Sequence, residues 1–434
     1  MSPGLRSRSA DFVRALTIAC AVATVLTRPN SAGAWTEYTL HSFCTKMRCA
    51  DGYLPNGVFV NASGRLIGTD ATAGEHGQGV LFWMAPRRHH KIWTFRVRYQ
   101  FCSDITGNCA DGGQPTGELI ADVKGRLYGV TRFPAAHSSG TVFRFTPGRP
   151  GGGYEVLYSF CNLTSCPGGY SPAKGLTYAG EAAGVPWDGV SPLFGTTDGG
   201  GEFGGGAIYE ITPRHSNFAE EAVYSFQSHH QVNGLISDAA GNLYGVTTNG
   251  GTHDSGQLFE LEHGTWNFKV LHDFCSAGGC GDGQYPIGRL AIDAMGHLFG
   301  VTAWGGRFQE TGVAYEFAPE TQQYTVIYPF CSADPFDGCS DGAYPQAGMT
   351  IGPDGDLFGT TWSGGGSDNS GIVFRLHFDG QWSETVVHAF CRTGGCNEGS
   401  GLMTPLSFDG AGNIFGTMQY GGGKQYGTVF ELTP

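Results

Sequence analysis

The chain has 434 residues, of which 72 are glycine and only 15% are charged, and its formal net charge is −13. Such a high glycine content disfavours long helices and suits tight β turns. The acidic balance repels nucleic acid and anionic membrane surfaces at long range, so neither is an expected partner.

Residues 1–34 are predicted to be a signal peptide. Three arginines precede the apolar stretch 15–26, which is too short to span a bilayer, and Ala32–Ala34 supplies the small residues that signal peptidase requires. The mature chain is therefore expected to begin at Trp35, with 21 basic and 37 acidic residues. Lipid attachment at Cys20 is the less favoured alternative. We expect a secreted or periplasmic protein without membrane insertion of its mature part.

Residues 35–434 are predicted to form one domain from seven repeats of about 58 residues. A phrase of the form G-x-L-[YF]-G-[VT]-T recurs seven times, with its shared glycine at Gly68, Gly129, Gly195, Gly245, Gly300, Gly359 and Gly416. This period, together with β signals alone, is typical of one propeller blade per repeat. The predicted fold is an all-β, seven-bladed propeller.

Each repeat contains four predicted short strands. In the fourth repeat these are expected at 234–238, 243–247, 257–261 and 267–274. The chain after residue 34 opens with a lone fourth strand at 38–43 and ends with a third strand at 428–433. One blade is therefore expected to combine both ends of the chain, which closes the ring and leaves no unpaired edge at the seam.

Twelve cysteines fall into six pairs that are close in sequence, and we expect them to form intrablade-loop disulfides. The pairs are Cys44/Cys49, Cys102/Cys109, Cys161/Cys166, Cys275/Cys280, Cys331/Cys339 and Cys391/Cys396. An even number of cysteines in an exported chain is typical of disulfides. Zinc is disfavoured because the intervals vary and no histidine recurs at a regular offset. We expect no metal and no cofactor.

The repeat resembles that of the GloVer (Gloeobacter–Verrucomicrobia) tandem-repeat β-propeller proteins. The phrase G-x-L-[YF]-G-[VT]-T, followed by glycines and then G-x-[VI]-[FY]-x-[LI]-x-P, covers essentially all of residues 35–434. The resemblance implies the propeller fold and implies no catalytic residues. Members often carry a C-terminal anchor, and we expect this chain to lack one.

Strand order predicts that two sets of long loops share one face of the ring. The cysteine loops join a fourth strand to the next first strand, and the glycine-rich loops join second strands to third strands. Loops on a rigid scaffold often carry binding residues. Candidate ligand-binding residues there are Phe133, Trp304, Trp362, Tyr420, Arg132 and Arg307. The aromatic rings suit sugars and the arginines suit carboxylates or sulfates, although the rings could equally pack against neighbouring loops.

The predicted function is a non-catalytic binding module for a glycan or an extracytoplasmic protein, acting through the cysteine-loop face. One alternative is a lyase-like enzyme that acts on polysaccharides, with His76, His137 or His253 as a general base. Another alternative is a structural or assembly platform. No H-E-x-x-H motif occurs. No catalytic residue is assigned, and an enzyme is the less favoured reading.

Overall fold

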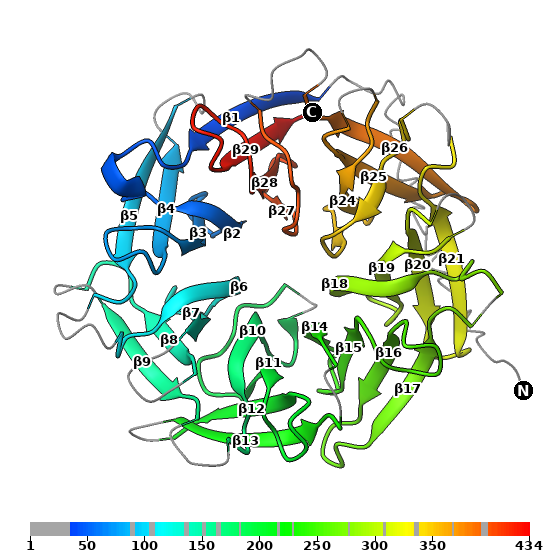
Figure 1. Cartoon of the computed structure of the whole chain (residues 1–434), viewed down its shortest axis with the longest axis horizontal. Helices are drawn as coiled ribbons and strands as arrows, with labels where there is room; N and C mark the ends of the chain where they lie inside the picture. The colour runs from blue at the N-terminus through cyan, green and yellow to red at the C-terminus, as the bar shows by residue number, and fades with distance from the viewer. Residues whose placement is uncertain are drawn as a thin grey trace, which may run out of the picture. The chain divides into compact units, whose positions relative to one another are not determined.

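The computed structural model describes residues 35–86, 92–103, 109–133, 139–149, 153–161, 166–181, 184–214, 218–227, 230–276, 278–306, 310–333, 338–366, 369–391 and 398–434. Within these residues the strands form seven antiparallel sheets, arranged as blades around the axis of a ring (Figure 1). The predicted seven-bladed propeller is confirmed. The predicted signal peptide, residues 1–34, lies outside the described residues.

In each of the first five blades, four strands follow one another outward from the axis in chain order. Blade 1 contains β2 (Tyr53–Val60), β3 (Leu66–Thr72), β4 (Val80–Pro86) and β5 (Trp93–Gln100). Blade 2 contains β6 (Gly113–Ala121), β7 (Leu127–Phe133), β8 (Thr141–Phe145) and β9 (Tyr154–Ser159). Blade 3 contains β10 (Tyr170–Thr177), β11 (Leu193–Gly199), β12 (Ala207–Pro213) and β13 (Phe218–Ser225). Blade 4 contains β14 (Val232–Ser237), β15 (Leu243–Thr247), β16 (Gln257–Leu261) and β17 (Phe268–Asp273). Blade 5 contains β18 (Gln284–Ile292), β19 (Leu298–Trp304), β20 (Val313–Ala318) and β21 (Gln323–Pro329).

The last two blades depart from this plan at their inner strands. Blade 6 contains β22 (Ala343–Pro345), β23 (Thr350–Ile351), β24 (Leu357–Ser363), β25 (Ile372–Phe378) and β26 (Trp382–Ala389). Its inner strand is thus split into β22 and β23, which both pair with β24. Blade 7 contains β27 (Ser407–Phe408), β28 (Ile414–Met418), β29 (Thr428–Thr433) and β1 (Thr36–Ser42). A short 3-10 helix, η1 (Met47–Cys49), follows β1.

The ring closes through blade 7, which combines both ends of the described chain. β1 pairs antiparallel with β29, with Thr36 opposite Thr433 and Ser42 opposite Thr428 (Figure 1). The predicted closure by a split blade is therefore confirmed. In the described part of the chain, no helix is long and apolar enough to cross a membrane.

The shared glycine of the repeat has a steric cause. In blade 4, a Cβ atom added to Gly245 would lie 2.7 Å from the ring of Phe259 on the neighbouring strand. The same approach occurs in all seven blades between the shared glycine and the aromatic residue of the third strand, at Phe82, Phe143, Tyr209, Phe259, Tyr315, Phe374 and Phe430. The glycine thus makes room for a buried ring, and these rings belong to the core between neighbouring blades.

The disulfides lie within single loops, as predicted. Five bonds are present among the described residues: Cys44–Cys49, Cys102–Cys109, Cys161–Cys166, Cys275–Cys280 and Cys331–Cys339. Cys391 is also disulfide-bonded, and its predicted partner Cys396 lies outside the described residues. Each loop runs from the outer strand of one blade to the inner strand of the next, so each bond stiffens a connection between blades.

Outer strands of neighbouring blades contact each other through stacked rings. Four such pairs occur: His41/Phe95 at 3.8 Å, Tyr99/Tyr154 at 4.0 Å, Tyr224/Phe268 at 4.6 Å and His272/Tyr324 at 3.7 Å between ring centroids. The first residue of each pair lies near the end of a fourth strand, two positions before a buried phenylalanine. In most repeats a loop cysteine directly follows this phenylalanine. These stacks extend the hydrophobic core to the rim of the ring.

In three blades, a glutamate occupies the outer-strand position at which the other four blades carry the second ring of a stacked pair. Glu37, Glu220 and Glu384 occupy this position, opposite the last buried residue of the third strand. Burial raises the pKa of Glu384 to about 8, and the negative charge of Asp341 adds to the effect. Glu384 Oε1 is buried and has no hydrogen-bond partner among the described residues. This position therefore favours the protonated carboxyl group.

We expect Glu384→Gln to make the protein more stable than the parent at pH 8.5, by about 2 kcal/mol. The folded pKa lies above the unfolded value, so the parent gains stability from this group below pH 4.5 and loses it as the pH rises toward 8. The amide stays neutral and removes this dependence. Thermal unfolding at pH 5 and pH 8.5 measures the effect, with the exposed Glu202→Gln as control. If the difference in stability between the variant and the parent were the same at pH 5 and at pH 8.5, the prediction would be contradicted.

Candidate functional site

The cysteine loops and the glycine-rich loops share one face, because they are hydrogen-bonded to each other. The carbonyl oxygen of the second loop cysteine accepts a backbone N–H from the glycine-rich loop of the same blade in four blades. These bonds run from Gly74 to Cys49 (3.0 Å), Gly201 to Cys166 (3.1 Å), Gly306 to Cys280 (2.9 Å) and Gly365 to Cys339 (2.9 Å). The predicted cysteine-loop face is thus a connected surface and not a set of independent loops.

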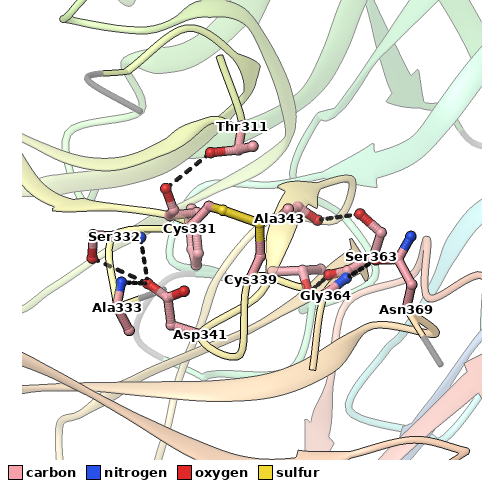
Figure 2. Close-up of a disulfide and its surroundings, with 12 residues drawn as sticks. Thr311, Cys331, Ser332, Ala333, Cys339, Asp341, Ala343, Ser363, Gly364 and Asn369 are labelled. Carbon is pink, nitrogen blue, oxygen red and sulfur yellow. Dashed lines mark hydrogen bonds between the residues drawn. A yellow bond between two sulfur atoms is a disulfide. The ribbon is translucent and has the colours of Figure 1, made fainter. Parts of the chain in front are cut away.

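An aspartate two residues after the second cysteine holds four of the cysteine loops in shape. In the loop of Cys331 and Cys339, the Asp341 carboxylate accepts hydrogen bonds from the Ser332 N–H (2.8 Å) and the Tyr328 hydroxyl (2.7 Å) (Figure 2). Asp51, Asp111 and Asp282 play the same part in their loops. Burial acts to raise the pKa of Asp51, but the nearby His41 and hydrogen bonds from Thr45 hold it well below its usual range. The signal for these residues was a recurrent C-x-D-G sequence, which our sequence analysis missed.

Aromatic side chains form pairs across three consecutive boundaries between blades. Trp304 of blade 5 lies 5.0 Å from Tyr344 of blade 6, and Trp362 of blade 6 lies 6.1 Å from Tyr420 of blade 7, between ring centroids. At the next boundary, a third pair joins Tyr426 of blade 7 to Tyr53 of blade 1 at 5.3 Å. We call these residues the aromatic belt: Trp304, Tyr344, Trp362, Tyr420, Tyr426 and Tyr53.

The belt remains open to solvent although its rings contact each other. Trp304 is 43% exposed, Trp362 36% and Tyr420 46%. The alternative in which these rings are simply buried by neighbouring loops therefore does not hold for the three predicted residues. Partly exposed aromatic rings of this kind can contact a flat ligand.

Tyr344 of the aromatic belt lies in a turn at the start of the inner strand of its blade. Tyr344 has φ 54° and precedes Pro345, and its N–H donates to the Thr311 carbonyl of the preceding blade (2.8 Å). The residue before proline in blades 1, 2, 3 and 5 also has a positive φ and makes the same kind of bond. This turn holds Tyr344 next to Trp304. Sequence reasoning missed Tyr344, Tyr53 and Tyr426 because their pairing depends on two blades at once.

The other predicted ligand-binding residues lie apart from the belt. Phe133 is 49% exposed at the end of β7 in blade 2 and belongs to none of the three ring pairs. Arg132 is already engaged in an ion pair with Asp198 of blade 3 (2.7 Å). Burial lowers the pKa of the neighbouring Lys174, against the opposing effect of Asp198. Arg307 lies outside the described residues.

The two histidines considered for catalysis that the structure describes lie in different blades. His76 is an exposed residue of blade 1, and His253 is an exposed residue of blade 4. His137 lies outside the described residues. Among the residues for which the structure gives a position, no group of three or more His, Cys, Asp or Glu side chains is arranged to hold a metal ion.

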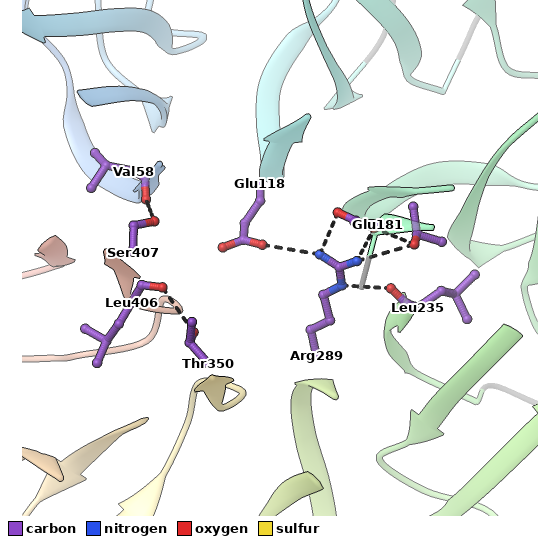
Figure 3. Close-up of polar contacts among 9 residues, drawn as sticks. Val58, Glu118, Glu181, Leu235, Arg289, Thr350, Leu406 and Ser407 are labelled. Atoms are coloured by element: carbon purple, nitrogen blue, oxygen red, sulfur yellow. Dashed lines mark hydrogen bonds and ion pairs between the residues drawn. The ribbon is translucent and has the colours of Figure 1, made fainter. Parts of the chain in front are cut away.

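A partly buried ion cluster joins four blades near the axis. Arg289 of β18 forms ion pairs with Glu181, which follows β10, and with Glu118 of β6, the latter at 3.7 Å. Its Nε donates to the Leu235 carbonyl of β14 (2.8 Å). Figure 3 shows the guanidinium between these groups, with Glu118 facing it from the opposite side of the axis. Burial raises the pKa of Glu118, and the charge of Arg289 opposes this effect.

The repeats also identify the family. Two stretches of the chain, residues 24–191 and 181–430, match the model of the Gloeobacter/Verrucomicrobia repeat. The chain belongs to this family. The family resemblance seen in the sequence is thereby confirmed. No curated protein matches the chain at a significant level.

Solved structures share the fold of this Gloeobacter/Verrucomicrobia repeat protein at very low identity. The extracellular domain of a putative one-component system from B. thetaiotaomicron is 9% identical, with a TM-score of 0.52 over 92% of this chain. The present chain spans only 40% of the length of that chain. A putative 6-phosphogluconolactonase from Bacteroides uniformis is 12% identical, with a TM-score of 0.45 over 76% of this chain and 83% of its own. At such identities the likeness concerns the fold.

Proposed function

We propose that this Gloeobacter/Verrucomicrobia repeat protein is a non-catalytic binding module that binds a glycan through the aromatic belt on its cysteine-loop face. The observation that supports the proposal is the series of three aromatic pairs across consecutive blade boundaries. The C–H-rich faces of sugar rings pack well against exposed aromatic rings. A curved row of such rings offers successive contacts to successive sugar units.

Export is part of the proposal. A propeller with several loop disulfides fits an exported protein, because such bonds persist in oxidising compartments. We propose secretion or release into the periplasm, with residues 1–34 as the signal peptide. An extracytoplasmic protein is the alternative ligand at the same face.

Affinity electrophoresis of the propeller through gels that contain neutral polysaccharides tests the glycan proposal. We expect a retarded parent protein and a Trp304→Ala/Trp362→Ala variant with affinity reduced about tenfold or more, because two ring contacts are lost. Phe378→Ala is the matched control, since Phe378 is 58% exposed at the far end of a third strand, on the opposite face. Unretarded migration of the parent in every gel would overturn the proposal.

A further inference from the structure

The basic residues of this acidic protein are concentrated in one blade. Residues 44–103 contain eight lysines and arginines and three acidic residues, whereas the rest of the chain after residue 34 contains 13 basic and 34 acidic residues. Two of the three acidic residues, Asp51 and Asp70, are fully buried. Five of these cations, Lys46, Arg48, Arg65, Arg96 and Arg98, lie among the described residues of this part of the chain, where Glu75 is the one acidic residue that is not buried.

A surface groove runs along the outer edge of this blade. It has a volume of about 430 Å3, and residues Val97–Gln100 of β5 form part of its lining. The strand β5 is the outermost strand of blade 1 (Figure 1). The residues that line it include Lys46, Glu75, Arg98, Tyr99, Gln100 and Ser103. Lys46 comes from the cysteine loop that enters the blade, so the groove extends from that loop across the edge of the sheet.

Three cations on the elements that form this groove have no acidic partners in the described part of the chain: Lys46 lines the groove, Arg48 lies on the same cysteine loop, and Arg96 lies on β5. Lys46, Arg48 and Arg96 are exposed, and none of them forms an ion pair with a described carboxylate. Arg289 and Arg132, by contrast, are both paired. Unpaired cations that stand close together repel each other, and an anionic ligand relieves this repulsion.

Arg98 is held in place by an aromatic ring. Its guanidinium carbon lies 3.9 Å from the centroid of Trp83, and Arg65 approaches the same ring at 5.0 Å. Arg98 Nε is buried and has no hydrogen-bond partner among the described residues. A guanidinium fixed by stacking loses little further freedom on binding and matches the paired oxygens of a carboxylate or sulfate.

We propose that the groove on blade 1 binds an anionic polysaccharide through its sulfate or carboxylate groups. Lys46, Arg48 and Arg96 contact the anionic groups of successive units. The strongly negative remainder of the surface disfavours nucleic acid, which presents its charge over a long, densely charged backbone. This site is separate from the aromatic belt and does not depend on its ligand.

The test compares two triple variants with the same change in net charge. Binding of the propeller to sulfated dextran, polygalacturonate, neutral dextran and single-stranded DNA is measured at several salt concentrations. We expect Lys46→Gln/Arg48→Gln/Arg96→Gln to weaken binding to an anionic dextran or polygalacturonate by about tenfold or more, and to reduce the salt slope of log Kd by roughly 2. The control Lys124→Gln/Arg149→Gln/Arg214→Gln removes exposed cations elsewhere and should change the affinity less than about twofold.

The four ligands separate the possible outcomes. Binding of sulfated dextran alone would assign sulfate as the recognised group, and binding of polygalacturonate alone would assign carboxylate. Equal losses in both triple variants, or DNA bound as tightly as the acidic polysaccharides, would overturn the proposal in favour of non-specific charge attraction. The Trp304→Ala/Trp362→Ala variant should retain polyanion binding, so failure of the aromatic-belt proposal is distinguishable from failure of this one.

Discussion

Deletion of residues 35–44 is expected to abolish cooperative folding of the propeller at room temperature. The deletion removes β1, which is the outer strand of blade 7, and leaves the edge of β29 unpaired. It also removes Phe43, a fully buried ring that packs against Phe82 and Phe95 of blade 1. Truncation of one buried phenylalanine costs about 3–5 kcal/mol, while a folded domain is stable by only about 5–15 kcal/mol.

Circular dichroism and thermal unfolding of the purified variant measure this effect. Phe43→Ala should produce a smaller loss of about 3–5 kcal/mol, because the strand and its pairing remain. Tyr38→Ala is the matched control on the same strand, since Tyr38 is 37% exposed, and it should cost about 1 kcal/mol or less. A truncated protein with the melting temperature of the parent would refute the structural importance of ring closure by β1.

Replacement of Arg289 by methionine is expected to destabilise the propeller by about 3–5 kcal/mol at pH 7.5. The substitution leaves the carboxyl groups of Glu118 and Glu181 near the axis without their shared cation. It also removes the hydrogen bond to the Leu235 carbonyl, so contacts among four blades are lost together. For a chain of this length, the expected fall in melting temperature is about 5 °C.

The effect of Arg289→Met should depend on pH. Without the cation, the two carboxylates repel each other, and nothing opposes the burial that raises the pKa of Glu118. The destabilisation is therefore largest at neutral pH and shrinks as the pH falls toward 5, where Glu118 takes up a proton. Calorimetry at pH 7.5 and pH 5 measures it, with Lys269→Gln as control. Lys269 is 54% exposed and pairs with Glu260 at 3.6 Å, so its loss should cost less than about 1 kcal/mol. Equal destabilisation at both pH values would argue against the carboxyl repulsion.

Strand positions were predicted most closely where the pattern is local. The strands expected at 243–247, 257–261 and 428–433 are observed as β15, β16 and β29 with the same bounds. Alternating apolar residues and turn glycines suffice there, because both signals act within a few residues. The first strand expected at 234–238 is observed as Val232–Ser237. Its register shifts between Val232 and Leu235, and such a bulge disrupts the alternation on which the prediction relied.

Residues that act in pairs across blades were harder to predict. The exposed positions of Trp304, Trp362 and Tyr420 followed from their place after a second strand, but their partners did not. Tyr344 reaches Trp304 only through a turn with positive φ that docks on the preceding blade. Nothing in the local sequence specifies the distance between two rings that belong to different sheets.

The sequence by itself determined the family, the number of blades, the closure of the ring and the cysteine pairing, because each of these depends on a repeated pattern or on short separations along the chain. The tertiary structure alone decided which side chains meet. It placed Arg289 between two glutamates from different blades, paired Arg132 with Asp198, and left the cations along β5 without described acidic partners. Contacts between residues far apart in sequence depend on how neighbouring sheets pack, and a one-dimensional pattern does not encode that distance.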